Sequence, residues 1–138
     1  MSSPPRRVFP RGEAGTIETE TLLQAAAAAA SEVKPTSLVH LDLRGICAFT
    51  DHFLIASAPS NRQVRAIAER IEERLLEKRV RMLHREGDLE ARWILLDYSD
   101  VIIHIFDEET RLYYDLEGLW ADAPRQELVG RTSHGSPR

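Results

Sequence analysis

The sequence predicts a mixed α/β domain, in which a β-sheet is flanked by helices. Short apolar runs rich in Val, Ile and Leu are typical of strands, and two longer segments have the composition or apolar spacing of helices. Their order is helix, two strands, helix, three strands, which is typical of a mixed α/β sheet. The 138 residues are 43% hydrophobic, enough for one domain with a buried core.

The two ends of the chain have too few apolar residues to join this core. Residues 1–15 are rich in Pro, Arg and Ser and are expected to form a disordered leader, whereas residues 123–138 are expected to form a disordered tail. The predicted α/β domain therefore spans residues 16–122.

Composition narrows the range of partners and compartments. The formal net charge is −4, which disfavours attraction of the whole molecule to nucleic acid or to an anionic membrane. No apolar run approaches the roughly 20 residues that a membrane-spanning helix needs, so no membrane association is expected. Cys47 is the only cysteine, which favours a reducing compartment, and we expect a cytoplasmic protein.

The first half of the domain begins with a helix over residues 19–33. This segment is dominated by alanine, which has the highest helix propensity, and Pro35 lies just beyond its end. Strands are predicted at residues 37–43 and 51–57, and Gly45 permits a turn between them.

The sequence APSNRQV at residues 58–64 lies between the second strand and an amphipathic helix. Ser60 and Gln63 have the spacing of a helix capping box, which favours a structural role. The alternative is a phosphate site at the helix N-terminus, assisted by Arg62. Phosphate loops generally use glycine for close backbone approach, but Ala58 and Pro59 occupy those positions here.

A nucleotidyl-transfer enzyme built on such a corner would also need carboxylates on a nearby strand to bind a divalent metal. The next predicted strand, residues 79–86, offers only His84 and Glu86 among several cations. We therefore expect no catalytic residues, no cofactor and no metal ligands.

The last predicted strands, residues 91–97 and 101–106, form a hairpin, and residues 108–120 form a short helix or turn. Alternation along each strand places a wholly aliphatic set on one face, which is expected to be core. The other face combines a tryptophan with aliphatic, acidic and histidine side chains: Trp93, Leu95, Asp97, Asp100, Ile102 and His104.

This second face is unusual because a two-residue loop at Tyr98 and Ser99 would place Asp97 opposite Asp100, where like charges repel. Three explanations remain open. A helix of the same domain could cover the face, a basic protein partner could bind it, or Asp97, Asp100 and His104 could bind a metal. The metal is disfavoured because His104 would lie about 13 Å along the strand from Asp100.

Four motifs together resemble the ribosomal silencing factor (Iojap-like) family over about residues 19–120. They are S-N-R-Q at Ser60–Gln63, W-x-L-x-D-Y-x-D at Trp93–Asp100, H-x-F at His104–Phe106 and Y-Y-D-L-x-x-L-W at Tyr113–Trp120. The family's usual Gly-Thr before S-N-R-Q is Ala58-Pro59 here, which further disfavours phosphate binding.

The resemblance implies a nucleotidyltransferase-like fold without the catalytic carboxylates, and therefore a protein that is not an enzyme. It implies binding to the large ribosomal subunit through the fourteenth ribosomal protein of that subunit. Bound there, family members block joining of the small subunit and repress translation under nutrient limitation. The resemblance also allows a contact with neighbouring ribosomal RNA, and homodimers are common in the family.

The family motif and the unusual hairpin face coincide, and we therefore predict that the ribosomal contact lies there. The predicted partner-binding residues are Trp93, Leu95, Asp97, Tyr98 and Asp100. Trp93 would be the apolar anchor, and the two aspartates would face basic groups. The alternative from another functional class is a nucleotide-binding or nucleotidyl-transfer enzyme centred on Ser60, Asn61 and Arg62.

Overall fold

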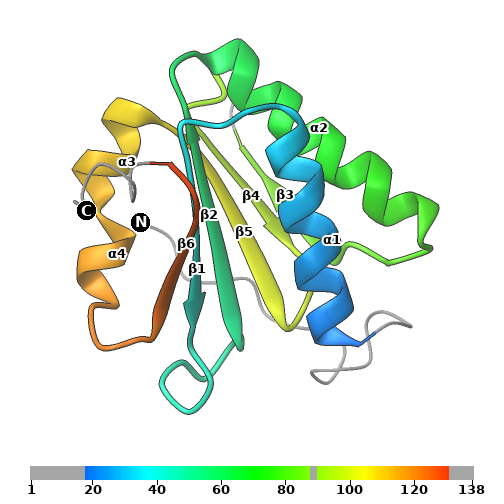
Figure 1. Ribbon diagram of the computed structural model, residues 1–138, viewed down its shortest axis with the longest axis vertical. Helices are drawn as coiled ribbons and strands as arrows, with labels where there is room; N and C mark the ends of the chain where they lie inside the picture. Colours follow the sequence, from blue (N-terminus) through cyan, green and yellow to red (C-terminus); the bar gives the residue numbers. More distant parts are fainter. Residues whose placement is uncertain (1–17, 88–89, 131–138) are drawn as a thin grey trace.

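The computed structural model describes residues 18–87 and 90–130 and contains a six-stranded sheet with helices on both faces (Figure 1). The strand order is β3-β4-β5-β2-β1-β6; β2 and β5 are parallel, and the other neighbouring pairs are antiparallel. The predicted mixed α/β class is therefore confirmed. The elements are α1 Thr19–Glu32, β1 Ser37–Asp42, β2 His52–Ala58, α2 Asn61–Glu77, β3 His84–Glu86, β4 Trp93–Asp97, β5 Val101–Asp107, α3 Glu108–Tyr114, α4 Leu116–Leu119 and β6 Arg125–Val129.

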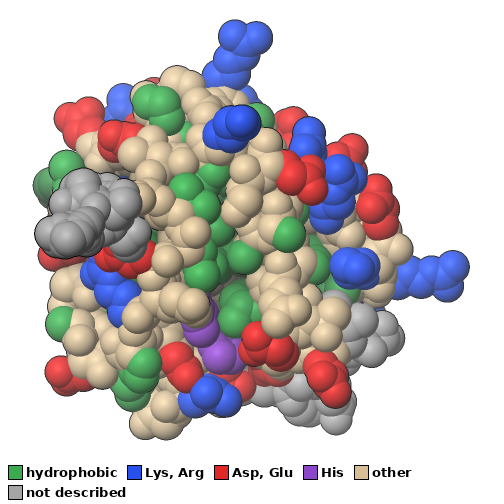
Figure 2. All heavy atoms as spheres, in the orientation of Figure 1, with side chains coloured by type: hydrophobic (Ala, Val, Ile, Leu, Met, Phe, Trp, Pro, Cys, Tyr) green, Lys and Arg blue, Asp and Glu red, His purple; other side chains and the backbone are tan. Residues whose placement is uncertain are grey.

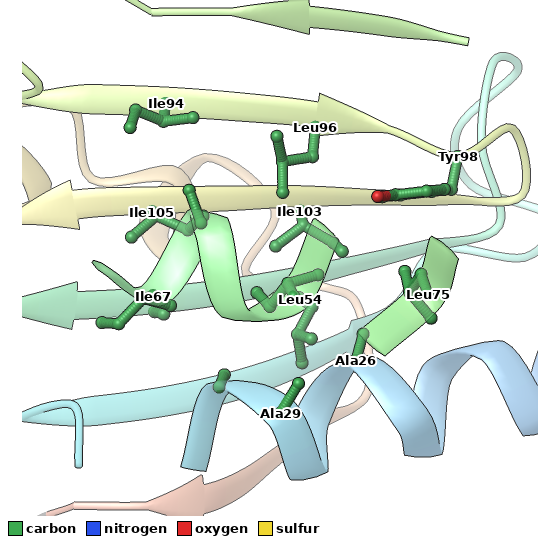
Figure 3. Packing of buried hydrophobic residues seen from close by; sticks show 14 of the residues in the cluster. Ala26, Ala29, Leu54, Ile67, Leu75, Ile94, Leu96, Tyr98, Ile103 and Ile105 are labelled. Carbon is green, nitrogen blue, oxygen red and sulfur yellow. The ribbon is translucent and has the colours of Figure 1, made fainter. Parts of the chain in front are cut away.

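Helices α1 and α2 pack on one face of the sheet and enclose the larger core. Alanines of α1 and aliphatic side chains from β2, β4 and β5 are directed into one layer between the sheet and these helices (Figure 3). Ala26 and Ala30 are fully buried, and their small side chains allow α1 to lie close to α2. The predicted apolar stripe of α2 is buried as expected: Val64, Ile67, Ala68, Ile71 and Leu75.

Helices α3 and α4 lie against the opposite face of the sheet (Figure 1), where a second and smaller core is found. The predicted segment 108–120 is divided into these two helices at Asp115, whose φ of 47° is left-handed. The second core contains Val39, Leu41, Phe53, Ile102, Phe106 and Leu116, with Trp93, Leu95 and Trp120 packed at its margin.

The Ser60 corner has the predicted capping role and also fixes the end of α1. The Ser60 hydroxyl accepts a hydrogen bond from the Gln63 backbone N–H at 3.2 Å. The Gln63 side-chain amide donates to the carbonyls of Val33, at 3.1 Å, and Lys34, at 3.2 Å. Both side chains of the capping motif therefore satisfy backbone groups at helix ends, which explains their spacing without a bound phosphate.

The hairpin of β4 and β5 has the predicted faces but a different register. Asp97 pairs with Ile102, and the Tyr98 N–H donates to the Val101 carbonyl at 2.9 Å, so the loop is Ser99-Asp100. The predicted pairing of Asp97 with Asp100 is therefore wrong. The sequence pattern could not reveal this because a register shift of two residues leaves every side chain on its predicted face.

Strand β6 lies where a disordered tail was expected. Residues 125–129 pair antiparallel with β1, so the tail predicted over residues 123–138 is wrong for this segment, and the domain extends beyond residue 122. Apolar patterning missed it because its side chains are mostly exposed, and it is held by its backbone and by ion pairs. Arg125 contacts Glu117 at 3.4 Å and Glu127 at 2.9 Å. The predicted leader 1–15 and residues 131–138 lie outside the described residues.

Deletion of residues 125–138 should lower the free energy of unfolding by about 2 kcal/mol or more. The deletion removes the backbone ladder with β1, and each net hydrogen bond is worth about 1 kcal/mol. Deletion of residues 131–138 alone is the matched control and should leave stability unchanged. Urea unfolding of both truncated proteins provides the measurement; equal stability of the two would show that β6 contributes nothing.

Candidate functional site

The five residues predicted to bind a partner occupy three different environments. Trp93 and Leu95 of β4 are half-buried on the sheet face that carries α3 and α4. Asp97 is only 3% exposed, and Tyr98 is 4% exposed and belongs to the core on the opposite face. Asp100 is half-buried in the hairpin loop. Trp93 and Leu95 are therefore accessible in part, whereas Asp97 and Tyr98 are covered.

Asp97 has a structural role in the hairpin loop. Its carboxylate accepts a hydrogen bond from the Ser99 backbone N–H at 2.8 Å. Ser99 has a φ of 80°, a left-handed conformation that is costly for a residue with a side chain and that local hydrogen bonds help to hold. Asp97 therefore stabilises the loop.

Asp100 connects this loop to other elements. One oxygen of its carboxylate accepts a hydrogen bond from the Thr19 hydroxyl at 3.0 Å, which links the loop to the first residue of α1. Its backbone carbonyl accepts bonds from the Thr50 hydroxyl at 2.9 Å and from the His52 N–H at 3.0 Å. The two aspartates of the family motif thus order the loop in different ways.

Trp93 is oriented by a buried histidine. Its indole N–H donates to Nδ1 of His104 at 3.1 Å, so the neutral imidazole carries its proton on Nε2. His104 lies edge-on to Phe53, with ring centroids 4.5 Å apart, and burial lowers its pKa to about 3. His104 is therefore a neutral support for Trp93, and the Trp93 ring is held in one orientation beside α3.

Sequence reasoning missed the apolar surface that α3 and α4 present to solvent. Large apolar side chains are strongly exposed on these two helices, and a group of such side chains is more informative than a single one. We call this set the α3 surface: Leu112 at 77%, Tyr113 at 79%, Tyr114 at 44% and Leu119 at 71% exposed. The Y-Y-D-L-x-x-L-W motif contains three of these four residues, and it was the signal that could have located the surface.

The α3 surface is continuous with the hairpin through aromatic contacts. The ring centroids of Trp93 and Tyr114 are 4.7 Å apart, and those of Tyr114 and Tyr113 are 4.9 Å apart. A surface hollow of about 420 Å³ lies beside these three rings. The first turn of α3 adds acidic residues, Glu108 and Glu109, so the apolar surface has a negative rim.

The opposite helical layer, formed by α1 and α2, carries acidic and basic side chains that pair with each other. On the face seen in Figure 2, acidic and basic side chains are intermingled over α2. Arg70 and Arg74 pair with Glu32 of α1 at 2.6 and 3.0 Å, and Arg85 of β3 pairs with Glu72 at 2.5 Å. These charges connect neighbouring elements of the protein, and they give α2 no surface of a single sign for an external partner.

Within residues 18–87 and 90–130, no three His, Cys, Asp or Glu side chains are grouped so that they could hold a metal ion. In the same part of the chain, no helix has the length and apolar character needed to cross a membrane.

Fold and surface together define a small α/β domain with an exposed apolar surface that has an acidic rim. Two crystal structures have the same fold. A protein from Chromobacterium violaceum gives a TM-score of 0.74 at 29% identity, covering 87% of this chain and 100% of that one. A protein from Bacillus halodurans gives a TM-score of 0.70 at 38% identity, covering 80% of this chain and 100% of that one.

Sequence comparison identifies the family. The family model described as "Ribosomal silencing factor during starvation" matches residues 16–137. "Ribosomal silencing factor RsfS" of Bacillus subtilis is 40% identical over 81% of this chain and 95% of that protein. "Protein Iojap, chloroplastic" of Zea mays is 35% identical over 74% of this chain and 44% of that protein. The chain belongs to the ribosomal silencing factor family, which confirms the resemblance inferred from its motifs.

Replacement of Asp97 by lysine should destabilise the protein by about 3 kcal/mol or more. The change removes the acceptor of the Ser99 N–H and places a cation at a position that is 3% exposed. Asp97→Asn is the matched control, because its amide oxygen can still accept the bond, and it should cost about 1 kcal/mol or less. Urea unfolding at neutral pH measures both; an Asp97→Lys protein as stable as the parent would contradict the loop role.

His104 should make stability depend on pH. Its folded pKa of about 3 lies below the ordinary value of 6.5, so the unfolded state binds more protons between these pH values. The stability that depends on a neutral His104 is fully present above pH 6.5 and is lost as the pH falls towards 3. His104→Phe should reduce the slope of unfolding free energy against pH by up to about 1.4 kcal/mol per pH unit in this window.

Chemical denaturation between pH 7 and pH 4 measures that slope, and His104→Gln should flatten it equally. The pKa values of His40 and His52 are also lowered by burial, so part of the slope remains in both variants. Curves for parent and variants that stay parallel would contradict the prediction.

Proposed function

We propose that this protein is a ribosomal silencing factor that binds the large ribosomal subunit through the fourteenth ribosomal protein of that subunit. Bound there, it blocks joining of the small subunit and represses translation under nutrient limitation, without catalysing a reaction. Family membership and the names of the relatives support the general role. A cytoplasmic location follows from the proposal, and contacts with ribosomal RNA or a second copy are compatible with it.

The α3 surface is the observation that carries this proposal. Interfaces with proteins are built around large apolar or aromatic side chains within a polar rim, and Tyr and Trp are frequent anchors. Tyr113 and Tyr114 provide such anchors beside the half-buried Trp93, while Glu108 and Glu109 provide an acidic rim. The rim is complementary to a basic ribosomal protein.

Two residues of the predicted contact remain in the proposal with Trp93. Leu95 continues the half-buried apolar surface along β4, and Asp100 lies in the hairpin loop, at the end of β4 away from α3. Asp97 and Tyr98 contribute through the shape of the hairpin, because both are buried. The proposed surface therefore extends from β4 across α3 to α4.

Nucleotide binding at Ser60, Asn61 and Arg62 has weaker support. The Ser60 hydroxyl caps α2, and the neighbouring Gln63 amide is bonded to the end of α1. Pro59 has no backbone N–H to offer a phosphate.

Leu112→Asp should abolish or strongly weaken binding to large subunits without reducing stability. Leu112 is 77% exposed, so the free protein loses little, whereas a complex that covers the α3 surface would have to bury a carboxylate there. Leu76→Asp on α2 is the matched control, because Leu76 is 73% exposed and lies in the opposite helical layer. We expect at least tenfold weaker co-sedimentation with purified large subunits for Leu112→Asp and parental binding for Leu76→Asp.

The same variants test the silencing step when small subunits are added to the preformed complex. Parent and Leu76→Asp proteins should prevent joining, and Leu112→Asp should permit it. Parental binding by Leu112→Asp would remove the α3 surface from the interface. Absence of binding by the parent itself would refute the proposed function.

A further inference from the structure

The hollow beside α3 has the features of a pocket for a flat organic cation. Its walls include the rings of Trp93, Tyr113 and Tyr114, which come from two separate elements. The Tyr113 and Tyr114 rings are nearly perpendicular, at 87°, while Trp93 and Tyr114 are inclined at 47°. Three aromatic rings in different planes therefore border a space of about 420 Å³.

The charges around these rings favour a positive ligand. Among the described residues, two carboxylates, Glu90 and Glu109, lie at the border of the hollow with a single cation, Arg92. Arg92 is already paired with Glu90 at 3.0 Å, whereas Glu109 has no ion-pair partner among the described residues. One negative charge therefore remains to be balanced beside the aromatic walls.

We infer that this hollow receives an arginine side chain of the protein partner, an inference that rests on the proposed function for the identity of that partner. A guanidinium group stacks on aromatic faces, is more weakly hydrated than an ammonium group, and can form two parallel hydrogen bonds with a carboxylate such as Glu109. Trp93 is the ring most suited to a cation, and its bond to His104 holds it in place.

An anionic ligand fits this hollow less well. A nucleotide base could stack on the rings, but its phosphates would then meet Glu90 and Glu109. The arrangement thus selects a cation over a nucleotide, even though both could use the aromatic walls.

The inference predicts different effects for two substitutions at one exposed position. Tyr113→Phe keeps a π face and should bind large subunits as the parent does. Tyr113→Leu removes that face and should bind about threefold to tenfold more weakly, the usual range for cation–π contacts of intermediate exposure. Tyr113 is 79% exposed, so both variants should fold, which their melting curves will verify.

The acidic component has a matched control in the opposite helical layer. Glu109 lines the hollow, whereas the exposed Glu69 lies on α2. Glu109→Gln should weaken binding to large subunits about threefold or more, and Glu69→Gln should leave it within twofold of the parent. Parental binding by both Tyr113→Leu and Glu109→Gln would overturn the inference.

A second measurement does not depend on the ribosome. The peptide Gly-Arg-Gly should shift the NMR signal of the Trp93 indole N–H saturably, whereas Gly-citrulline-Gly, its uncharged counterpart, should shift it at least fivefold less. The Trp120 indole, which does not line the hollow, is the internal reference. Equal shifts by the two peptides, or no shift of Trp93, would overturn the inference. Failure of the parent to bind large subunits, with a selective arginine response, would refute the proposed function and retain the arginine pocket.

Discussion

The parallel pairing of β2 and β5 is the constraint on which the rest of the structure depends. All seven residues of β2 are buried, as are the first six of β5, so both faces of this pair must be covered. Parallel strands need a long crossover, and here α2 lies in that crossover and covers one face. The chain leaves β5 towards the opposite face, where α3 and α4 complete the cover. The α3 surface therefore lies on the face opposite α2, because the buried parallel strands need helices on both faces.

Much of this architecture could be predicted because a buried face of a helix or strand gives a regular spacing of apolar residues in the sequence. The apolar stripe of α2, the two faces of the β4–β5 hairpin and the Ser60 cap follow from local spacing alone. Elements that are held by backbone hydrogen bonds or by ion pairs produce no such spacing and could not be predicted in this way. Strand β6 pairs with β1 while its side chains remain mostly exposed, and the pairing of Arg125 with Glu117 joins residues that have no periodic relation.

The candidate site was predictable only in part, for two physical reasons. The hairpin register depends on the left-handed Ser99, and nothing in the composition of a short loop requires a serine to adopt that conformation. The predicted repulsion between Asp97 and Asp100 disappears once the register moves by two residues, and each carboxylate accepts a different hydrogen bond. Leu112 and Tyr113 were missed because α3 is too short for apolar periodicity to distinguish an exposed face from a buried one.

His104 has a structural role beside the proposed partner-binding surface. A histidine on a sheet beside aromatic side chains could be a proton-transfer group, but burial keeps its pKa near 3, far below the range in which a general base would operate. Its Nδ1 instead accepts the Trp93 N–H, so the one polar atom of the indole is satisfied inside the protein. The outward part of Trp93 can then offer its π surface beside Tyr114 without leaving an unpaired donor in a future interface. In the proposed complex, this buried contact leaves the aromatic surface without an unpaired donor, and the neighbouring carboxylates favour a basic partner.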